Sequence, residues 1–379
     1  MQIIKKTKIA LLATALVQFA MPAHADTSVM LSGYLDDALA YVSSNGGHGP
    51  QWGLSSGNHS TDAWSLSGSE DLGGGLAATF MLENQFDVNS GQALNDSRLF
   101  GSQAFVGLTS EQWGSLTLGR QEDPLSQLMQ PITAQPFSGT YGSPGDIDNY
   151  DNSANFNNAI EWTSPSLGGV TLQGMYAFGG VAGSTGSGQS YSGAASYAHG
   201  PCTAVAGILH VDNGSATAST RGNSSSDSFF GSAVNQAYAS ARSIDIVRAG
   251  AQYVIGKVTL GGAYSFSEYN RDSASTFAKA EKYANGSVFA QWQATEALQL
   301  IAGYNETKSS GDSSAKYHQA NLGADYALSK RTDMYAMGGF QRASGRNGLG
   351  AAQAVIGSYD IDSGKSTQAL AFVGIRHKF

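Results

Sequence analysis

The side chains that could do chemistry are mainly carboxylates, and they gather in one irregular segment. That segment contains Glu122, Asp123, Asp146, Asp148 and Asp151. Clustered carboxylates can bind a hard cation such as Ca²⁺, or they can create a local negative potential. Tyr150 occupies the fifth position of the run that starts at Asp146, where an EF-hand loop needs an acid or an amide. We therefore interpret the segment as an acidic loop, with a calcium site as the alternative.

The histidine and cysteine patterns do not indicate catalysis. A hydrolase would need a nucleophile beside a histidine base. The histidines are instead scattered along the chain, at His24, His48, His59, His199, His210, His318 and His377. Cys202 is the single cysteine, which excludes an intramolecular disulfide. We predict no catalytic site, no metal site and no cofactor, and we expect that the protein is not an enzyme.

Composition narrows the class of fold that must position these side chains. Charged residues make up 13% of the 379-residue chain, and 48 residues are glycine. Ordinary soluble domains carry roughly 25% charged residues and about 7% glycine. The 17 tyrosines, 16 phenylalanines and 5 tryptophans exclude a disordered chain, and a formal net charge of −8 argues against nucleic-acid binding. A large, glycine-rich and aromatic β protein remains.

The first 25 residues have the pattern of a secretory signal peptide. Lys5, Lys6 and Lys8 form a basic region, residues 9–21 form an apolar run, and Ala23 and Ala25 frame a cleavage site. A membrane anchor is the alternative, but the apolar run is short for one and lacks a stop-transfer flank. We expect residues 1–25 to be removed and residues 26–379 to form one domain.

The rest of the chain shows sixteen segments in which apolar and polar side chains alternate, as in strands between two environments. In one of them, Val258, Leu260 and Tyr264 alternate with Thr259 and Gly261. We place the strands at residues 27–43, 62–71, 76–87, 98–109, 115–121, 155–164, 170–180, 189–199, 202–212, 243–255, 257–269, 281–295, 297–308, 315–328, 332–343 and 366–379. Their connections alternate between tight turns and long polar segments, such as residues 45–61. This pattern predicts an all-β protein, a transmembrane antiparallel β-barrel.

A closed sheet also meets the physical demands of a membrane span. Backbone N–H and C=O groups in hydrocarbon stay paired only if the sheet closes on itself. A barrel of about sixteen strands with a polar inner face is wide enough for an aqueous channel. A soluble β-solenoid, lectin or adhesin is one alternative, although we would expect more surface charge on it. An outer-membrane barrel hydrolase is another.

Four runs in the chain carry a family resemblance. They are SVMLSGYLD at 28–36, GSEDLGGGL at 68–76, LTLGRQ at 116–121 and VGIRHKF at 373–379. In sequence and order, these runs resemble the trimeric general porins of Gram-negative bacteria, and most closely their β-proteobacterial branch. The resemblance implies a homotrimer of barrels in the cell outer membrane, through which small hydrophilic solutes and ions diffuse passively. A substrate-specific outer-membrane channel is the alternative.

In that family the third long loop folds into the barrel and narrows the pore. The resemblance assigns this role to residues 122–154, which contain all five acids of the irregular segment. Pro136 and Phe137 stand in the turn of that loop, although the acid that the family usually has there is absent. In the family, basic residues on the opposite wall face the loop acids, and the resulting field acts on solutes as charged rings do in other filters.

This chain departs from the family on the pore wall. Ala63, Ser67 and Ser102 stand where basic residues are usual, and Glu83 adds an acid to the wall. A narrow, water-filled pore that keeps its carboxylates and loses its cations has a more negative potential. We therefore predict a channel that prefers cations or is weakly selective.

Two arginines and one aspartate near the wall allow more specific expectations. Arg98 shares strand parity with Ser102, so we expect it to face inward near the external mouth. Arg120 matches a family Gly-Arg pair, and it either joins the filter or anchors loops. Asp62 is expected to face outward by parity, and we give it no role in the pore.

The C-terminal end resembles the barrel-insertion signal of the family. Val373, Ile375 and the terminal Phe379 carry this likeness. We expect Phe379 to lie at the periplasmic end beside the first strand, close to Asp26. The resemblance also implies periplasmic chaperones, the barrel-assembly machinery, outer-membrane lipid and lipopolysaccharide as partners, with trimer contacts at Gly33, residues 88–97 and the first strands.

Overall fold

The computed structural model describes residues 28–95, 98–212 and 224–379, so the predicted signal peptide lies outside the described residues. The first strands are β1 (Ser28–Val42), β2 (Gln51–Ser56), β3 (Ala63–Gly73), β4 (Leu76–Gln85), β5 (Gln103–Ser110) and β6 (Gly114–Gln121). After these come α1 (Pro124–Met129), η1 (Gln130–Ile132), η2 (Gly139–Tyr141), η3 (Pro144–Asp146), β7 (Phe156–Thr163), β8 (Val170–Ala177), β9 (Ser190–His199), β10 (Cys202–Asp212) and η4 (Gln236–Tyr238). The last are β11 (Ser243–Ile255), β12 (Val258–Asn270), β13 (Glu281–Gln293), β14 (Leu298–Ser310), β15 (Lys316–Ala327), β16 (Thr332–Ser344), β17 (Arg346–Asn347), β18 (Gly350–Ala351) and β19 (Thr367–Lys378). Across these described ranges, none of the helices has the length and apolar character needed to cross a membrane.

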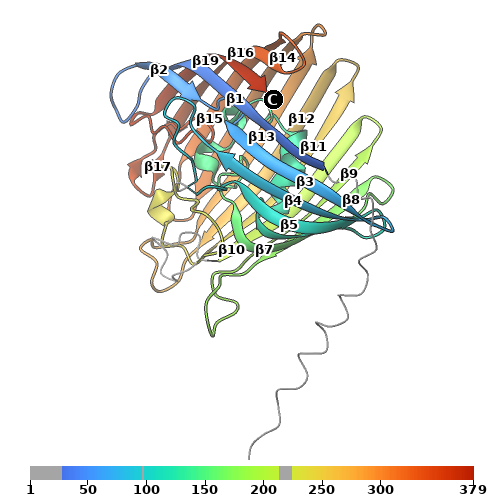
Figure 1. The fold of residues 1–379 in the computed structure, drawn as a ribbon. Helices are drawn as coiled ribbons and strands as arrows, with labels where there is room; N and C mark the ends of the chain where they lie inside the picture. Colours follow the sequence, from blue (N-terminus) through green and yellow to red (C-terminus); the bar gives the residue numbers. More distant parts are fainter. Residues whose placement is uncertain (1–27, 96–97, 213–223) are drawn as a thin grey trace, which may run out of the picture.

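The strands form a closed antiparallel barrel, as predicted. Within the described residues the main sheet has seventeen strands, and β1 pairs with β19 from Tyr34–Lys378 to Val42–Leu370, which joins its two ends. Tight turns gather at one end of the barrel and long connections at the other (Figure 1). Each of the sixteen predicted segments corresponds to a position in this sheet.

The second barrel position is divided between two strands. The N-terminal half of β1 pairs with β3, from Ser28–Ser69 to Tyr34–Ala63. Its C-terminal half pairs with β2, from Asp37–Ser56 to Val42–Gln51. Because β2 and β3 share one position, the seventeen strands occupy sixteen positions around the barrel. The prediction that residues 45–61 form only a loop was wrong, because this stretch contains β2. The short run of β2 lies between polar turns and has too few residues to show a clear alternation.

The two faces of the strands meet different environments. Leu39, Val106, Val247, Val288 and Leu322 point outward and are exposed on the outer surface of the barrel. Inward-facing positions of neighbouring strands carry buried polar side chains, including Ser265, Asn305, Gln319, Gln341 and Gln368. Such alternation places apolar groups towards lipid and polar groups towards the lumen.

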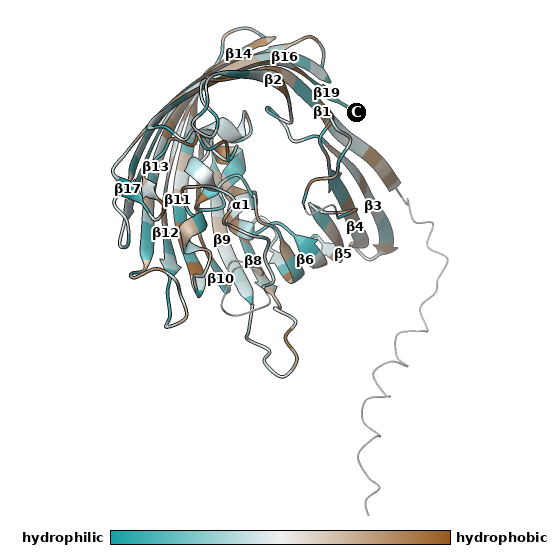
Figure 2. Cartoon of the chain, turned by 90° about the vertical axis from the view of Figure 1, so that its left-hand side faces the viewer, coloured by the Kyte–Doolittle hydropathy of each residue, from teal (hydrophilic) through white to brown (hydrophobic). Residues whose placement is uncertain are grey.

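Several long connections fold back into the lumen and fill part of it. The segment that contains α1 lies inside the ring of strands (Figure 2). Buried apolar residues of this segment, including Met129 and Ile147, pack with Leu209 and Ile244 of β10 and β11. Parts of the predicted loops 213–242 and 344–365 are also buried, as Val234 and Val355 show. The core of this protein therefore lies between the inner wall and its own loops.

The two ends of the barrel sequence meet at the end with the tight turns. The Phe379 N–H donates to the Gly33 carbonyl at 3.1 Å, and the Gly33 N–H donates to the Phe379 carbonyl at 3.2 Å. Phe379 therefore lies beside the first strand, as predicted. Its predicted neighbour Asp26 lies outside the described residues. Val373, Ile375 and Phe379 all point to the outer face.

Candidate pore and its constriction

The constriction loop, defined here as residues 122–155, enters the lumen directly after β6. At its start the Asp123 carboxylate caps α1, because it accepts the N–H groups of Leu125 at 2.8 Å and Ser126 at 3.1 Å. Asn149 Nδ2 donates to the same carboxylate at 2.8 Å. Asp123 is fully buried, so it ties the two ends of the loop together and does not face the pore.

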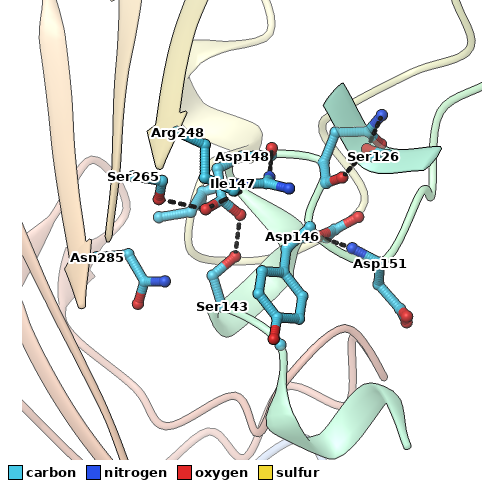
Figure 3. Close-up of polar contacts among 12 residues, drawn as sticks. Ser126, Ser143, Asp146, Ile147, Asp148, Asp151, Arg248, Ser265 and Asn285 are labelled. Carbon is cyan, nitrogen blue, oxygen red and sulfur yellow. Dashed lines mark hydrogen bonds and ion pairs between the residues drawn. The ribbon is translucent and has the colours of Figure 1, made fainter. Parts of the chain in front are cut away.

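Asp148 fixes the middle of the constriction loop to the wall (Figure 3). Arg248 of β11 donates to the Asp148 backbone carbonyl, and its guanidinium lies 3.6 Å from the carboxylate. Ser143 at 2.6 Å and Ser265 of β12 also donate to this carboxylate. Both charged side chains are at most 1% exposed. This ion pair is therefore part of the loop's anchor and is shielded from solutes.

The tip of the constriction loop rests on two glycines of the wall. A Cβ atom at Gly323 of β15 would clash with the Phe137 ring, and one at Gly303 of β14 would lie 2.6 Å from the Tyr141 ring. Phe137 and Tyr141 are both buried and touch each other edge to face at 5.9 Å between ring centroids. Phe137 is thus an anchor, whereas the adjacent Pro136 is exposed.

Asp146 and Asp151 take separate partners within the loop. The Asp146 carboxylate accepts the N–H groups of Asp151 at 2.9 Å and Ser153 at 3.1 Å. The Asp151 carboxylate accepts from Gln135 at 2.5 Å and from Ser358. Burial, together with the charges of Asp151 and Asp148, raises the pKa of Asp146 to about 7. In the described part of the chain, these loop carboxylates do not meet as one set of metal ligands.

The opposite wall carries an acid supported by hydroxyl groups. Glu83 of β4 accepts from Ser65 of β3 at 2.6 Å and from Ser102 at 2.7 Å. Ala63 and Ser67 follow the same inward parity as Ser65 along β3. Ala63 is almost fully buried in the wall, and Ser102 is fully buried beside Glu83. Of the predicted wall residues, Ser102 thus contacts the Glu83 carboxylate, while Ala63 and Ser67 lie two positions on either side of its other partner, Ser65.

Glu122 lies next to this wall acid at the start of the constriction loop. Burial raises the pKa of Glu122 to about 7, and the charges of Glu83 and Asp123 act in the same direction. A hydrogen bond with Gln103 opposes this shift. The pair of Glu83 and Glu122 is the acidic centre of the wall side.

Arg98 and Arg120 converge on an acid that the sequence did not indicate. Arg120 Nη2 and Arg98 Nη1 both pair with the Asp227 carboxylate, the latter at 2.9 Å. Arg120 also donates to the Gly101 carbonyl at 2.7 Å and to Asn157 Oδ1 at 2.8 Å, and it is 7% exposed. These contacts fit the anchor alternative for Arg120. Asp227 lies in an irregular segment, where no periodicity could mark it.

The predicted placement of Arg98 on a strand was wrong. β5 begins at Gln103, and Arg98 follows a turn at Asn95, whose backbone has a positive φ of 55°. Strand parity therefore does not extend back to Arg98. Its position is set by Asp227 on another loop.

Residues 57–62, which we call the inner turn, also enter the lumen. Asp62 is fully buried and accepts from the Asp36 N–H and from Ser56, so its predicted outward position was wrong. Two polar cavities flank the turn, and Ser60, Thr61 and Pro136 line both of them. We call the boundary between the two cavities, where these three residues lie, the neck.

The side chains that hold the inner turn were not predicted from the sequence. They are Asp36 of β1, His59 of the turn, Asp325 of β15, Asp333 and Tyr335 of β16, and Arg376 of β19. The inward parity of Asp36 and Arg376 was a usable signal, because a charged residue on a lumen-facing strand position needs a partner. Nothing in the sequence indicated that His59 would join them.

The chain is similar to known proteins in sequence and in fold. The family model described as Gram-negative porin matches residues 12–346. The chain belongs to this family. The resemblance found in the sequence is thereby confirmed, and the protein is a porin of the Gram-negative outer membrane.

Two curated relatives span the porin from end to end. An outer membrane porin protein of Bordetella pertussis is 29% identical over 99% of this chain and 100% of its own length. Outer membrane porin protein 32 of Delftia acidovorans is 29% identical over 98% of this chain and 100% of its own length. Both agree with the predicted β-proteobacterial branch.

Solved structures give the same fold for this porin. An anion-selective porin from Comamonas acidovorans matches with a TM-score of 0.75 and 25% identity, over 93% of this chain and 100% of that one. OmpT of Vibrio cholerae in its trimer form matches with a TM-score of 0.65 and 14% identity, over 93% of this chain and 99% of that one. The second likeness concerns the fold alone.

Proposed function

We propose that the porin forms a water-filled pore for passive diffusion of small hydrophilic solutes and ions, and that it prefers cations or is weakly selective. The observation that carries this proposal is the distribution of ion pairs around the pore. Arg98 and Arg120 are paired with Asp227, and Arg248 is paired with Asp148. Glu83, in contrast, is held by two neutral serines.

The neutral wall positions support the same proposal. Ala63 and Ser102 lie beside Glu83, where a basic side chain would neutralise it. Two unit charges about 4 Å apart interact by roughly 4 kcal/mol at an effective dielectric constant near 20. The loss of even one wall cation therefore changes the local potential that a permeating ion meets.

The Comamonas relative is an anion-selective porin, which points in the opposite direction. Ion preference depends on a few side chains in the pore and does not follow from the fold. Lys378 lines the same cavity as Glu83 and is the basic counterweight there, whereas Arg376, which also lines that cavity, is paired with Asp333 at 3.0 Å. The charge of Lys378, with any contribution that Arg376 makes beyond its ion pair, decides between the two preferences.

The reversal potential in a KCl gradient tests this proposal. We expect the reversal potential of the unmodified porin to lie between zero and the potassium equilibrium potential, or close to zero. The double substitution Ala63→Arg and Ser102→Arg should move it towards the chloride value, because it restores two wall cations. The matched control, Ala63→Gln with Ser102→Gln, adds comparable bulk without charge and should leave the sign unchanged. A strong chloride preference of the unmodified porin would contradict the proposal and assign the filter to Arg376 and Lys378.

We also propose that the porin is a homotrimer, with Gly33, residues 88–97 and the first strands at the contacts, of which residues 96–97 lie outside the described residues. Exposed apolar side chains on this side of the barrel, such as Leu54, Leu99 and Val106, support such a contact. Cleavage of residues 1–25, periplasmic chaperones, the barrel-assembly machinery and lipopolysaccharide complete the proposed assembly.

A further inference from the structure

The inner turn lies between the two cavities, because its residues Ser60 and Thr61 line both of them. The upper cavity is lined by residues of the turn together with Gln135 and Pro136 of the constriction loop. The lower cavity is lined by Ser60 and Thr61 together with Pro136, Glu83, Gln85 and Lys378. A solute that passes from one cavity to the other must therefore pass the turn as well as the constriction loop.

A buried carboxylate on β1 holds the backbone of the turn. Asp36 is 1% exposed, and its Oδ2 atom accepts the N–H groups of His59 and Ser60, both at 2.7 Å. The Tyr335 hydroxyl donates to the other oxygen of the same carboxylate. Hydrogen bonds to an ionised acceptor are roughly twice as strong as neutral ones. The turn is thus fixed at two successive peptide groups.

A second link closes the turn from its other end. Asp62 accepts from the Asp36 N–H and from the Ser56 hydroxyl. The Asp36 carboxylate thus accepts from the backbone of the turn, and the Asp62 carboxylate at the end of the turn accepts from the backbone of Asp36. This reciprocal arrangement defines the entry and the exit of the turn.

His59 joins the turn to the tip of the constriction loop. Its ring stacks on Phe137 at 4.9 Å between centroids and meets Tyr335 edge to face at 5.3 Å. Arg376 Nη1 lies 3.2 Å from His59 Nδ1, and Asp325 Oδ2 lies 3.5 Å from His59 Nε2. Arginine can only donate, so His59 Nδ1 is the acceptor in its contact with Arg376.

Arg376 completes the support of the turn from the barrel wall. Asp333 holds its guanidinium through Nε at 3.1 Å and Nη2 at 3.0 Å, and Arg376 Nη1 donates to the Ser60 hydroxyl at 2.8 Å. Strands β1, β16 and β19, from both ends of the chain, thus contact the inner turn at His59, Ser60 and Asp62.

We propose that the inner turn is a second constriction element, and that Asp36 and His59 are the positioning residues that set the size limit of the pore. The turn holds Ser60 and Thr61 against the neck opposite the exposed Pro136, so the free cross-section depends on both elements. The inference rests on the water-filled channel of the proposed function, but it does not depend on the ion preference. If the turn only filled space, its release would not change what passes through the pore.

Single-channel conductance at high salt and the size cut-off for neutral sugars in liposome swelling test this proposal. His59→Ala removes the stack on Phe137 and the link to Arg376, so the turn loosens. We expect the conductance to rise by about 1.5- to 2-fold and larger sugars to enter, because flux follows the narrowest cross-section. The matched control is His210→Ala, since His210 pairs with Asp245 outside the neck. It should leave both readings unchanged.

A second pair of variants tests the carboxylate clamp. Asp36→Asn keeps the shape and weakens the hold on the two peptide groups, and we expect the same direction of change. Asp37→Asn is the control, because Asp37 interacts with Asn89 and its own neighbour Ala38. Unchanged conductance and cut-off in correctly inserted His59→Ala and Asp36→Asn porin would overturn the proposal.

A labelling experiment gives an answer even if these variants do not insert. Thr61 is exposed at the neck, so Thr61→Cys in a Cys202→Ala background should react with a neutral thiol reagent and lose conductance in discrete steps. The Cys202→Ala parent should be unaffected. No loss of conductance on complete labelling would place the turn away from the neck and reject the proposal. The reversal potential of the parent separately decides the ion preference.

Discussion

The acidic pair of Glu83 and Glu122 is where a single residue can change the behaviour of the pore. Glu83 is supported by Ser65 and Ser102. Burial and the neighbouring carboxylates raise the pKa of Glu122 to about 7. Glu122 therefore changes charge close to neutral pH, whereas an ordinary glutamate does so near 4.3.

The cation preference of the porin should fall as the solution is acidified. A raised pKa means that Glu122 is ionised above about pH 7 and protonated below it, so the negative charge at the wall is lost between about pH 8 and about pH 6. Reversal potentials in a KCl gradient across this range measure the effect. Glu122→Gln should remove most of the change, although Asp146 also titrates near pH 7. A pH dependence that is undiminished in Glu122→Gln would assign the change to Asp146.

The constriction loop shows how an element depends on close approach to the wall. Its tip is held where Phe137 lies over Gly323 and Tyr141 lies over Gly303. Added atoms at such positions force side chains out of place, which typically costs about 1–3 kcal/mol. Glycine at these positions is therefore a condition for the loop to lie flat on β14 and β15.

Gly323→Ala should displace Phe137 and loosen the tip of the constriction loop. We expect a lower midpoint of thermal unfolding and more open-channel current noise, because the tip is no longer seated. Gly174→Ala is the matched control, since a Cβ atom at Gly174 would meet nothing within 4 Å. If the two variants behave alike, the seat on Gly323 does not hold the loop.

The contact between Gly33 and Phe379 extends the pairing of β1 with β19 that closes the whole barrel. The two residues exchange backbone hydrogen bonds, and a Cβ atom at Gly33 would lie 2.6 Å from the Phe379 ring. Deletion of Phe379 should reduce membrane insertion and leave periplasmic aggregates. Gly33→Ala should weaken closure in the same direction, whereas Gly53→Ala should not, because its Cβ atom would have open space. Membrane fractionation measures each outcome, and normal insertion without Phe379 would reject its role as an insertion signal.

The assembly of several barrels is the largest scale at which a prediction can be made. Lipid can cover the apolar outer face of a single barrel, so the barrel fold does not by itself require a trimer. The trimer therefore needs its own test. Unheated samples should migrate on a gel at about three times the mass of heated samples, because a folded trimer resists dissociation. Light scattering provides the check. A monomer under both conditions would exclude the trimer.

The barrel itself follows from the sequence alone. Alternation along a strand is a local property, because each side chain faces either lipid or the lumen. The alternation in strands such as β12 and β14 therefore marked them without any knowledge of their partners. Tight turns and long connections then indicated that consecutive strands pair, and the end of the last strand at Phe379 was expected beside the first strand.

The constriction was decided by the tertiary structure. Arg120 meets Asp227, and His59 meets Arg376, across separations of 107 and 317 residues. Such contacts involve irregular segments, which have no period to reveal which way a side chain points. Asp62 shows this limit, because strand parity predicted an outward side chain and the inner turn brings it into the lumen. The sequence by itself determined a barrel with polar interior positions, while only the folding of its loops into the lumen decided which of its charges remain available to a passing ion.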